Sequence, residues 1–340
     1  MRELWFPGLG IDKFKINPVA FSIGDMSVAW YSLIITTGML LAILYVWFRF
    51  KEGGLSIDDL IDFALIVIPS GIVGARLYYV IFSLDHYKGN FWEIFAIWKG
   101  GLAIYGGIIA GAIAAFLVAR HKKINLLKVF DMLAPAVMMA QAIGRWGNFT
   151  NVEAFGGPTT LPWRMCGKRI TDNFIYKGLI DVKDIGLLES GEIGAHPTFL
   201  YESLWNIIGF IAIYFLFVRR KKLHKIDGQI FYCYLIWYGL GRFWIEGLRS
   251  DSLYLIKDVI RVSQLVALLS FIAGVALMIY GLVRYNKTGK GAAVHAVAQC
   301  ENAVATQTTV NDTTEEGEQT NGTNNQRKRS GAKGKRKNKK

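Results

Sequence analysis

Residues 132–156 read MLAPAVMMAQAIGRWGNFTNVEAFG, an apolar run that ends in a cluster of polar residues. The apolar part is typical of a helix buried in a membrane, and Arg145 follows it almost directly. A guanidinium at bilayer depth is costly, so it usually faces a polar cavity, a partner or a substrate. Gly144, Gly147 and Gly156 leave room for a close backbone approach. The stretch therefore predicts a site for an anionic group beside lipid.

The composition is that of a polytopic membrane protein. Of the 340 residues, 52% are hydrophobic. Apolar runs of about 18 residues or more recur, each long enough to cross a bilayer. An ordinary water-soluble domain is therefore excluded. Cys166, Cys233 and Cys300 fall in different regions, so they form neither a disulfide framework nor a metal-binding set.

The apolar runs predict an all-α polytopic membrane protein with about seven transmembrane helices. Arg76 and Arg242 interrupt the second and the sixth run, but the flanking residues remain apolar. The predicted spans are residues 27–48, 59–83, 98–119, 128–146, 198–218, 228–247 and 262–283.

Positive charges between the spans predict the orientation. Basic groups follow the first, third, fifth and seventh spans, so all of them lie on one side of the membrane. The positive-inside rule makes that side cytoplasmic, with the N-terminus outside and the C-terminus inside. The basic groups are Arg49 with Lys51, residues 120–123, residues 219–222, and Arg284 with Lys287 and Lys290.

Two segments lie outside the spans. Residues 147–197 form the one long loop of the membrane domain (1–290); it is extracytoplasmic on this topology, with short strands between Thr159 and Asp172. Residues 291–340 are polar and end in a basic run, which predicts a disordered cytoplasmic tail. The tail either contacts anionic lipids, contacts RNA or the ribosome, or stays solvated without a dedicated partner.

Further polar side chains lie in the outer halves of the spans. Tyr238, Arg242 and Glu246 are four residues apart, so they share one helical face, and the last two can pair. A buried charge set can also simply neutralise itself, so for Arg76 and Glu246 a structural role competes evenly with a site role. For His196, which precedes a proline at a helix start, a structural role competes in the same way.

Tyr105 lies between two pairs of glycines, Gly100-Gly101 and Gly106-Gly107. Gly107 and Gly111 are typical of a helix-packing surface. That role does not explain the tyrosine, whose phenol can exchange a proton or bind a headgroup. The five histidines are scattered along the chain, so the sequence predicts no metal site.

Together these motifs resemble the prolipoprotein diacylglyceryl transferase family, over about residues 20–285. The most specific of them is the pattern G-R-x-G-N-F-x-N-x-E-x-x-G at residues 144–156, here called the signature. The others are Trp30-Tyr31, Gly74-Ala75-Arg76, Gly100-Gly101 with Tyr105-Gly106-Gly107, His196-Pro197 with Tyr201-Glu202, and residues 238–249.

The resemblance implies a multi-pass enzyme of the bacterial cell membrane, with its active site toward the extracytoplasmic leaflet. The family transfers the diacylglyceryl group of phosphatidylglycerol to the thiol of the lipobox cysteine of a preprolipoprotein and releases glycerol 1-phosphate. This is the first step of lipoprotein maturation. The implied partners are phosphatidylglycerol, lipobox signal peptides and membrane lipids, with no cofactor and no specific nucleic acid.

The resemblance also implies residue roles. Arg145 matches the family's lipid-binding arginine and Arg242 a second essential arginine, and guanidinium forks suit phosphate oxygens. Many members have His in place of Tyr105, and a neutral phenol is the weaker base. Tyr105 is thus either a base in a cationic field or a residue that positions lipid. Beside the catalytic set Tyr105, Arg145 and Arg242, the expected substrate-binding residues are Arg145, Asn148, Asn151, Glu153, Gly156, Tyr31, Arg76, Tyr238, Glu246 and His196.

Two other classes of function compete. A transporter or channel for an anionic solute would also use arginines inside a glycine-rich bundle, but it should show repeated spans, and none is apparent. A membrane scaffold that acts through its basic tail leaves the buried Arg and Asn residues unexplained. The sequence therefore favours the transferase.

Truncation after about residue 290 should preserve the activity that the resemblance implies, because every candidate site residue precedes the tail. The measurement is the turnover of the truncated protein beside the full chain at equal abundance. A large fall in turnover would show that the tail contributes to the site.

Overall fold

The computed structural model describes residues 1–24, 26–87, 91–97, 100–220, 223–252, 254–256 and 260–288. The tail expected at 291–340 lies outside the described residues. Two compact units divide the chain, Met1–Gly281 and Leu282–Lys340; the second is described only for the end of the last helix. The chain is mostly helical, and its long helices are α1 (Trp30–Glu52), α2 (Ile57–Ile81), α3 (Ile104–His121), α4 (Leu126–Asn151), α7 (Thr198–Ile213), α8 (Gln229–Leu248) and α9 (Val262–Thr288).

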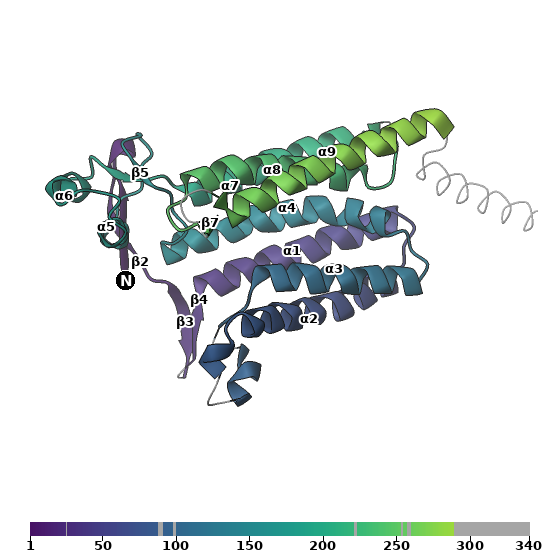
Figure 1. Ribbon diagram of the computed structural model, residues 1–340, viewed down its shortest axis with the longest axis horizontal. Helices are drawn as coiled ribbons and strands as arrows, with labels where there is room; N and C mark the ends of the chain where they lie inside the picture. The colour runs from purple at the N-terminus through teal and green to yellow at the C-terminus, as the bar shows by residue number, and fades with distance from the viewer. Residues whose placement is uncertain are drawn as a thin grey trace, which may run out of the picture. The chain divides into compact units, whose positions relative to one another are not determined.

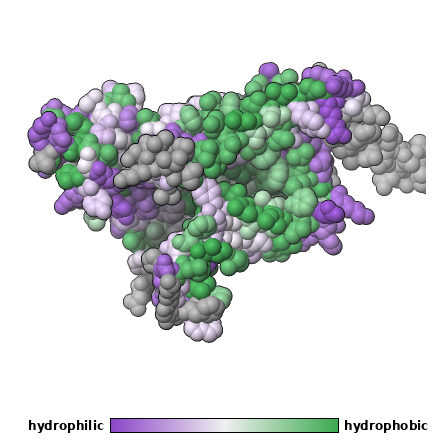
Figure 2. Space-filling model, in the orientation of Figure 1, coloured by the Kyte–Doolittle hydropathy of each residue, from purple (hydrophilic) through white to green (hydrophobic). Residues whose placement is uncertain are grey.

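Six helical segments of the described chain are long and apolar enough to cross a membrane. They are α1 to α4, α9, and Thr198–Arg219, in which α7 continues into the π-helical turn η6 (Tyr214–Arg219). α8 is also long, but polar residues such as Arg242 and Glu246 make it less apolar. Apolar residues dominate the visible face of the helices (Figure 2), as expected for a multi-pass membrane protein.

Two helix boundaries differ from the prediction in a way that matters for the site. α3 begins at Ile104 instead of residue 98, because Gly100 and Gly101 adopt φ values of 88° and 75°, which are not helical. α4 continues past residue 146 to Asn151, so most of the signature is helical. The long loop therefore begins at Val152.

α4 lies at the centre of the bundle (Figure 1), where it packs against α1, α7 and α8. α2 and α3 form a close pair through facing glycines. A Cβ on Gly106 would lie 2.3 Å from the carbonyl oxygen of Gly74, and a Cβ on Gly74 would lie 2.6 Å from the carbonyl oxygen of Gly106. The predicted packing role of Gly107 extends to Gly106, whereas Gly111 has only a loose contact at 3.8 Å.

The expectation of an all-α protein omitted several short strands. A hairpin of β1 and β2 opens the chain and turns at Gly10, whose φ is 69°. These strands have two to six residues, too short for an apolar run to mark them, and strands were predicted only within the long loop. The described strands pair two by two: β1 (Arg2–Phe6) with β2 (Ile11–Ile16), β3 (Val19–Ile23) with β4 (Met26–Ala29), β5 (Pro158–Thr159) with β6 (Gly194–Ala195), and β7 (Tyr254–Ile256) with β8 (Ile260–Arg261).

The β1–β2 hairpin and the long loop fold together into a head at one end of the helices (Figure 1). Here "the head" means residues 1–16 and 152–197. Trp5 and Cys166 exchange both backbone hydrogen bonds, at 3.0 and 2.9 Å, and Leu4 and Phe199 belong to one buried core with loop residues. Part of the loop that was predicted as strand is the helix α5 (Lys168–Tyr176), because its apolar residues have helical spacing.

The remaining short helices complete the described chain. The head also contains α6, which follows the 3-10 turn η5 directly. Two further 3-10 turns precede α3. The bounds are η1 (Pro7–Leu9), η2 (Leu84–Tyr87), η3 (Phe91–Phe95), η5 (Val182–Asp184) and α6 (Ile185–Glu189).

Replacing Gly106 by alanine should lower the thermal stability of the protein in detergent, because the new methyl group would collide with backbone of α2. Gly111→Ala is the matched control on the same helix; it meets no close neighbour and should be neutral or stabilising by up to about 1 kcal/mol. Equal melting temperatures for both variants would contradict the close α2–α3 contact.

Candidate active site

α4 carries the signature and ends in a strained turn. Val152 has a φ of 46°, and Ala154 has a φ of 56°. Left-handed conformations are uncommon for residues other than glycine, and each costs roughly 1–3 kcal/mol. The two strained residues flank Glu153 and turn its carboxylate back toward the last turn of α4.

Two side-chain amides hold Glu153. Asn148 Nδ2 and Asn151 Nδ2 each donate to Glu153 Oε1 at 3.2 Å. Asn148 Oδ1 accepts a hydrogen bond from Arg145 Nη1 at 3.4 Å, and Asn151 Oδ1 accepts one from Arg2 Nη1 at 3.2 Å. The polar residues of the signature thus form one hydrogen-bonded chain from Arg145 to Arg2 in the head.

Glu202 on α7 lies at the centre of the site, and the residue is only 4% exposed. Its Oε2 is 2.5 Å from Arg145 Nη2, and its Oε1 is 2.9 Å from Arg242 Nη1. Arg249 Nη1 approaches the same Oε1 at 3.6 Å. One buried carboxylate therefore joins arginines that come from α4 and from the C-terminal end of α8.

A second layer of carboxylates completes the charge balance. Arg242 Nη2 lies 2.7 Å from Glu246 Oε2, which confirms the predicted pairing of these two residues. Arg249 binds Asp251 through Nε and Nη2, at 2.9 and 2.8 Å. Burying a group of side chains whose charges cancel costs much less free energy than burying an unpaired charge. Three arginines here face three carboxylates: Arg145, Arg242 and Arg249 with Glu202, Glu246 and Asp251.

Tyr31 borders the network from the start of α1. A Cβ on Gly147 would lie 2.8 Å from Cδ2 of Tyr31, so the ring packs directly on the glycine of the signature. Tyr31 also interacts electrostatically with Glu153 and Arg145. The glycine at position 147 therefore lets α1 bring a phenol close to the polar residues of α4.

Tyr238 and Tyr105 approach from α8 and α3. Tyr238 lies close enough to Arg145, Glu202 and Arg242 to interact electrostatically with each of them, and with Tyr105. Tyr105 is half-buried in the first turn of α3. Tyr238 thus lies near each of the three residues expected to be catalytic, Tyr105, Arg145 and Arg242, which come from three helices.

Arg76 has different neighbours. The residue is 7% exposed, and its guanidinium donates to the carbonyl oxygens of Glu93 (2.6 Å), Ile94 (2.7 Å), Gly100 (2.7 Å) and Gly101 (2.9 Å). A guanidinium has five N–H groups, so these bonds leave little for a substrate. The contacts favour the structural alternative, in which Arg76 supports the chain that leads into Tyr105.

Gly156 and His196 contact each other. The N–H of Gly156 donates to the carbonyl of His196 at 2.9 Å, and a Cβ on Gly156 would lie 2.7 Å from His196 Cβ. His196 Nδ1 lies 3.3 Å from Tyr201 Oη. Burial lowers the pKa of His196 from its ordinary value, so the ring is neutral at neutral pH. These contacts fix the start of α7, one turn before Glu202.

Glu202 and Arg249 were not predicted as site residues, although they hold the network together. A signal for Glu202 was present, because a carboxylate inside an apolar span needs a cation at the same depth. Arg249 follows the last turn of α8, and its carboxylate partner comes two residues later. No group of His, Cys, Asp or Glu residues in the described part of the chain is arranged to hold a metal ion.

Comparison with known proteins identifies the family. A sequence model described as prolipoprotein diacylglyceryl transferase matches residues 18–280. Three relatives are named phosphatidylglycerol–prolipoprotein diacylglyceryl transferase. The Streptococcus uberis protein is 44% identical over 268 residues, or 78% of this chain and 95% of its own. The Enterococcus faecalis protein is 45% identical over 269 residues (78% and 90%), and the Lysinibacillus sphaericus protein is 40% identical over 278 residues (81% and 96%).

The chain belongs to the prolipoprotein diacylglyceryl transferase family. It is therefore an enzyme, a membrane transferase of lipoprotein biosynthesis, as the resemblance implied. The region that matches the family includes the signature and Glu202. It begins after β2, so Arg2 reaches the signature from outside the matched region.

Replacing Glu202 by glutamine should destabilise the protein by about 3 kcal/mol, because two partly buried arginines would lose the buried anion that they share. Thermal unfolding in detergent measures the effect. The control is Asp181→Asn, which removes an exposed carboxylate paired with Lys183 at 3.2 Å and should cost less than about 1 kcal/mol. Equal, small shifts for both variants would contradict the central place of Glu202.

Proposed function

We propose that the chain transfers the sn-1,2-diacylglyceryl group of phosphatidylglycerol to the thiol of the lipobox cysteine of preprolipoproteins and releases glycerol 1-phosphate. The relatives carry the names of both substrates. The single observation that carries the proposal is the pair of partly buried arginines, Arg145 and Arg242, on one buried carboxylate at the head end of the bundle. Such a pair suits a phosphodiester whose acyl chains remain in lipid.

The proposed topology has seven spans, with α8 as the sixth in chain order. The connections that carry basic residues lie at the end of the bundle away from the head (Figure 1). Contacts join these connections: Lys128 Nζ donates to the carbonyl of Gly53, and Asn125 Nδ2 donates to Asp227. The positive-inside rule then supports a cytoplasmic side there, and an extracytoplasmic N-terminus, head and active site. The membrane domain is 1–290 and the tail 291–340.

In the proposed complex, the phosphate of the lipid replaces Glu202 in some of its contacts with Arg145 and Arg242. Each oxygen of Glu202 engages a different arginine, and two phosphate oxygens can bridge the same two guanidinium groups. The phosphate then adds one negative charge to the set of three arginines and three carboxylates. Tyr31, Asn148 and Tyr238 also lie near these arginines.

The transfer itself is a substitution at the glyceryl carbon that bears the phosphate. The sulfur of the lipobox cysteine forms a bond to that carbon while the bond from carbon to phosphate oxygen breaks. The electron pair leaves on the phosphate, which becomes glycerol 1-phosphate, and Arg145 and Arg242 stabilise the charge that develops there. The proton of the thiol goes to a base or to the departing phosphate.

Two groups are candidates for the proton acceptor. One is the hydroxyl of Tyr105, which lies near Tyr238, and Tyr238 in turn lies near Arg145 and Arg242. The phosphate oxygen needs no protein group at all. Two of the described histidines have their contacts elsewhere: His196 contacts Tyr201 and Gly156, and His224 Nε2 lies 3.0 Å from Asp131 Oδ2.

The experiment that tests the function is incubation of the purified protein with phosphatidylglycerol and a lipobox peptide. Arg145→Ala should abolish transfer but still insert into the membrane, because the phosphate loses one side of its clamp. Arg49→Ala, at the cytoplasmic end of α1 on the proposed topology, is the matched control and should keep most of the activity. Near-normal turnover of the Arg145 variant at normal abundance would overturn the assignment.

Tyr105→Phe separates the two proton acceptors. We expect a partial loss of about ten- to a thousandfold in turnover at saturating substrates, near the range that a positioned acid or base contributes. Tyr105→His should be tolerated, because the family commonly has that residue there. Full activity of the Phe variant would remove the hydroxyl from the mechanism and leave the phosphate as the acceptor.

A further inference from the structure

A basic pocket on the head lies next to the signature but takes no part in the arginine–carboxylate network. Its volume is about 430 Å³. Four cations contribute to its lining, and only two carboxylates do, so the pocket carries excess positive charge. The cations are Arg2, Lys15, Lys168 and Arg169, and the carboxylates are Glu3 and Asp172.

The cations of this pocket differ from those of the active site in having no anion of their own. Within the described ranges, none of the four lies within 4 Å of a carboxylate oxygen, whereas Glu3 pairs with Lys13 at 3.9 Å. Burial and, to a smaller extent, repulsion by the neighbouring Arg169 lower the pKa of Arg2 from its ordinary value, while Glu153 opposes this shift. An anion bound between them would relieve that repulsion.

Arg2 connects the pocket to the signature. Its Nη1 donates to Asn151 Oδ1 at 3.2 Å and to the carbonyl oxygen of Thr150 at 3.5 Å. Through Asn151, Glu153 and Asn148, this bond continues to Arg145. The hydrogen-bonded chain that starts at the active site therefore ends at this pocket.

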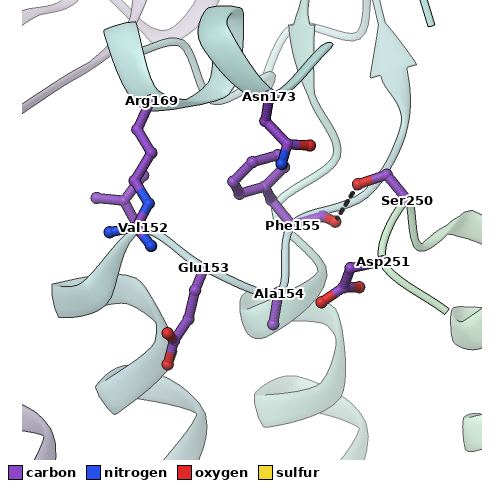
Figure 3. Close-up of a pocket in the computed structure, with 8 residues that line it drawn as sticks. All are labelled: Val152, Glu153, Ala154, Phe155, Arg169, Asn173, Ser250 and Asp251. Atoms are coloured by element: carbon purple, nitrogen blue, oxygen red, sulfur yellow. Dashed lines mark hydrogen bonds between the residues drawn. The ribbon is translucent and has the colours of Figure 1, made fainter. Parts of the chain in front are cut away.

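Arg169 gives a second connection. It also lines a smaller pocket of about 120 Å³ beside Glu153. Figure 3 shows Arg169 reaching from α5 toward Val152, while the carboxylate of Glu153 points the other way. Arg169 thus lies on the head side of the strained turn, and the carboxylate of Glu153 lies on the side of α4.

We propose that this pocket binds a phosphate group, and that its occupant is the phosphomonoester released by the transfer reaction. The identity of the occupant rests on the function proposed above. Glycerol phosphate is a small, water-soluble dianion. Each arginine of the active site is paired with a carboxylate, and this carboxylate can displace glycerol phosphate from the arginine. The nearest unpaired cations along the hydrogen-bonded chain are those of the pocket. A lipid headgroup offers the same phosphate chemistry, and the kinetic test below separates the two sources.

The direct test is the affinity of the full-length protein in detergent for inorganic phosphate, measured by calorimetry. The double variant Lys15→Gln, Lys168→Gln removes two exposed cations of the pocket. Its affinity for phosphate should fall about tenfold or more, the effect of lost charged hydrogen bonds. Lys183→Gln is the control, because it removes one exposed cation of the same head outside the pocket, and it should leave the affinity unchanged. Equal affinities for the double variant and the control would overturn the proposal.

Steady-state kinetics separate the sources of the phosphate. If the pocket holds the product, the double variant raises the inhibition constant of added glycerol 1-phosphate about tenfold and leaves the KM for phosphatidylglycerol unchanged. If the pocket holds a lipid headgroup, the KM rises instead, and the assignment to the product fails. Pocket-dependent phosphate binding without any transfer would contradict the proposed function but not the pocket. Normal transfer without such binding would contradict only the proposal that the pocket binds phosphate.

Discussion

The buried carboxylate of Glu202 is the constraint on which the rest of the site depends. Its two oxygens lie 2.5 and 2.9 Å from Arg145 and Arg242, which are on different helices. Two like charges at this depth repel each other and lose their hydration, so they are stable together only with an anion between them. The pairing therefore sets the register of α4, α7 and α8 and keeps both guanidinium groups aimed at one point. A phosphate can occupy that point because the protein already holds an anion there.

The strained turn at Val152–Ala154 couples this network to the head. Left-handed φ values of 46° and 56° persist only where the surroundings hold them. Val152 is buried in the head core with Leu4 of the β1–β2 hairpin, and Glu153 between the strained residues binds two amides of the signature. Arg2 from the same hairpin completes the chain. Strand pairing at the N-terminus thus contributes to the geometry of a site at the end of α4.

The sequence predicted the elements whose signals are long and local. Seven apolar runs became seven long helices, with ends moved by a few residues, and the four-residue spacing of Arg242 and Glu246 predicted their ion pair. Contacts between distant segments were beyond reach. The partners of Glu202 lie 57 residues before and 40 residues after it in the chain, and no local pattern pairs them. The short strands escaped for a related reason: the hydrogen bonds of Trp5 go to Cys166, which only the fold brings near.

The most direct test of the shared-anion site is the ³¹P resonance of phosphatidylglycerol titrated with purified protein in detergent. We predict that the wild-type protein shifts and broadens the resonance, because two guanidinium groups bind the phosphate and give up part of their contact with Glu202. The double variant Arg145→Ala, Arg242→Ala should lose this effect while it keeps its helical circular dichroism. The same shift in the double variant as in the wild type would contradict the assignment of these arginines to the phosphate.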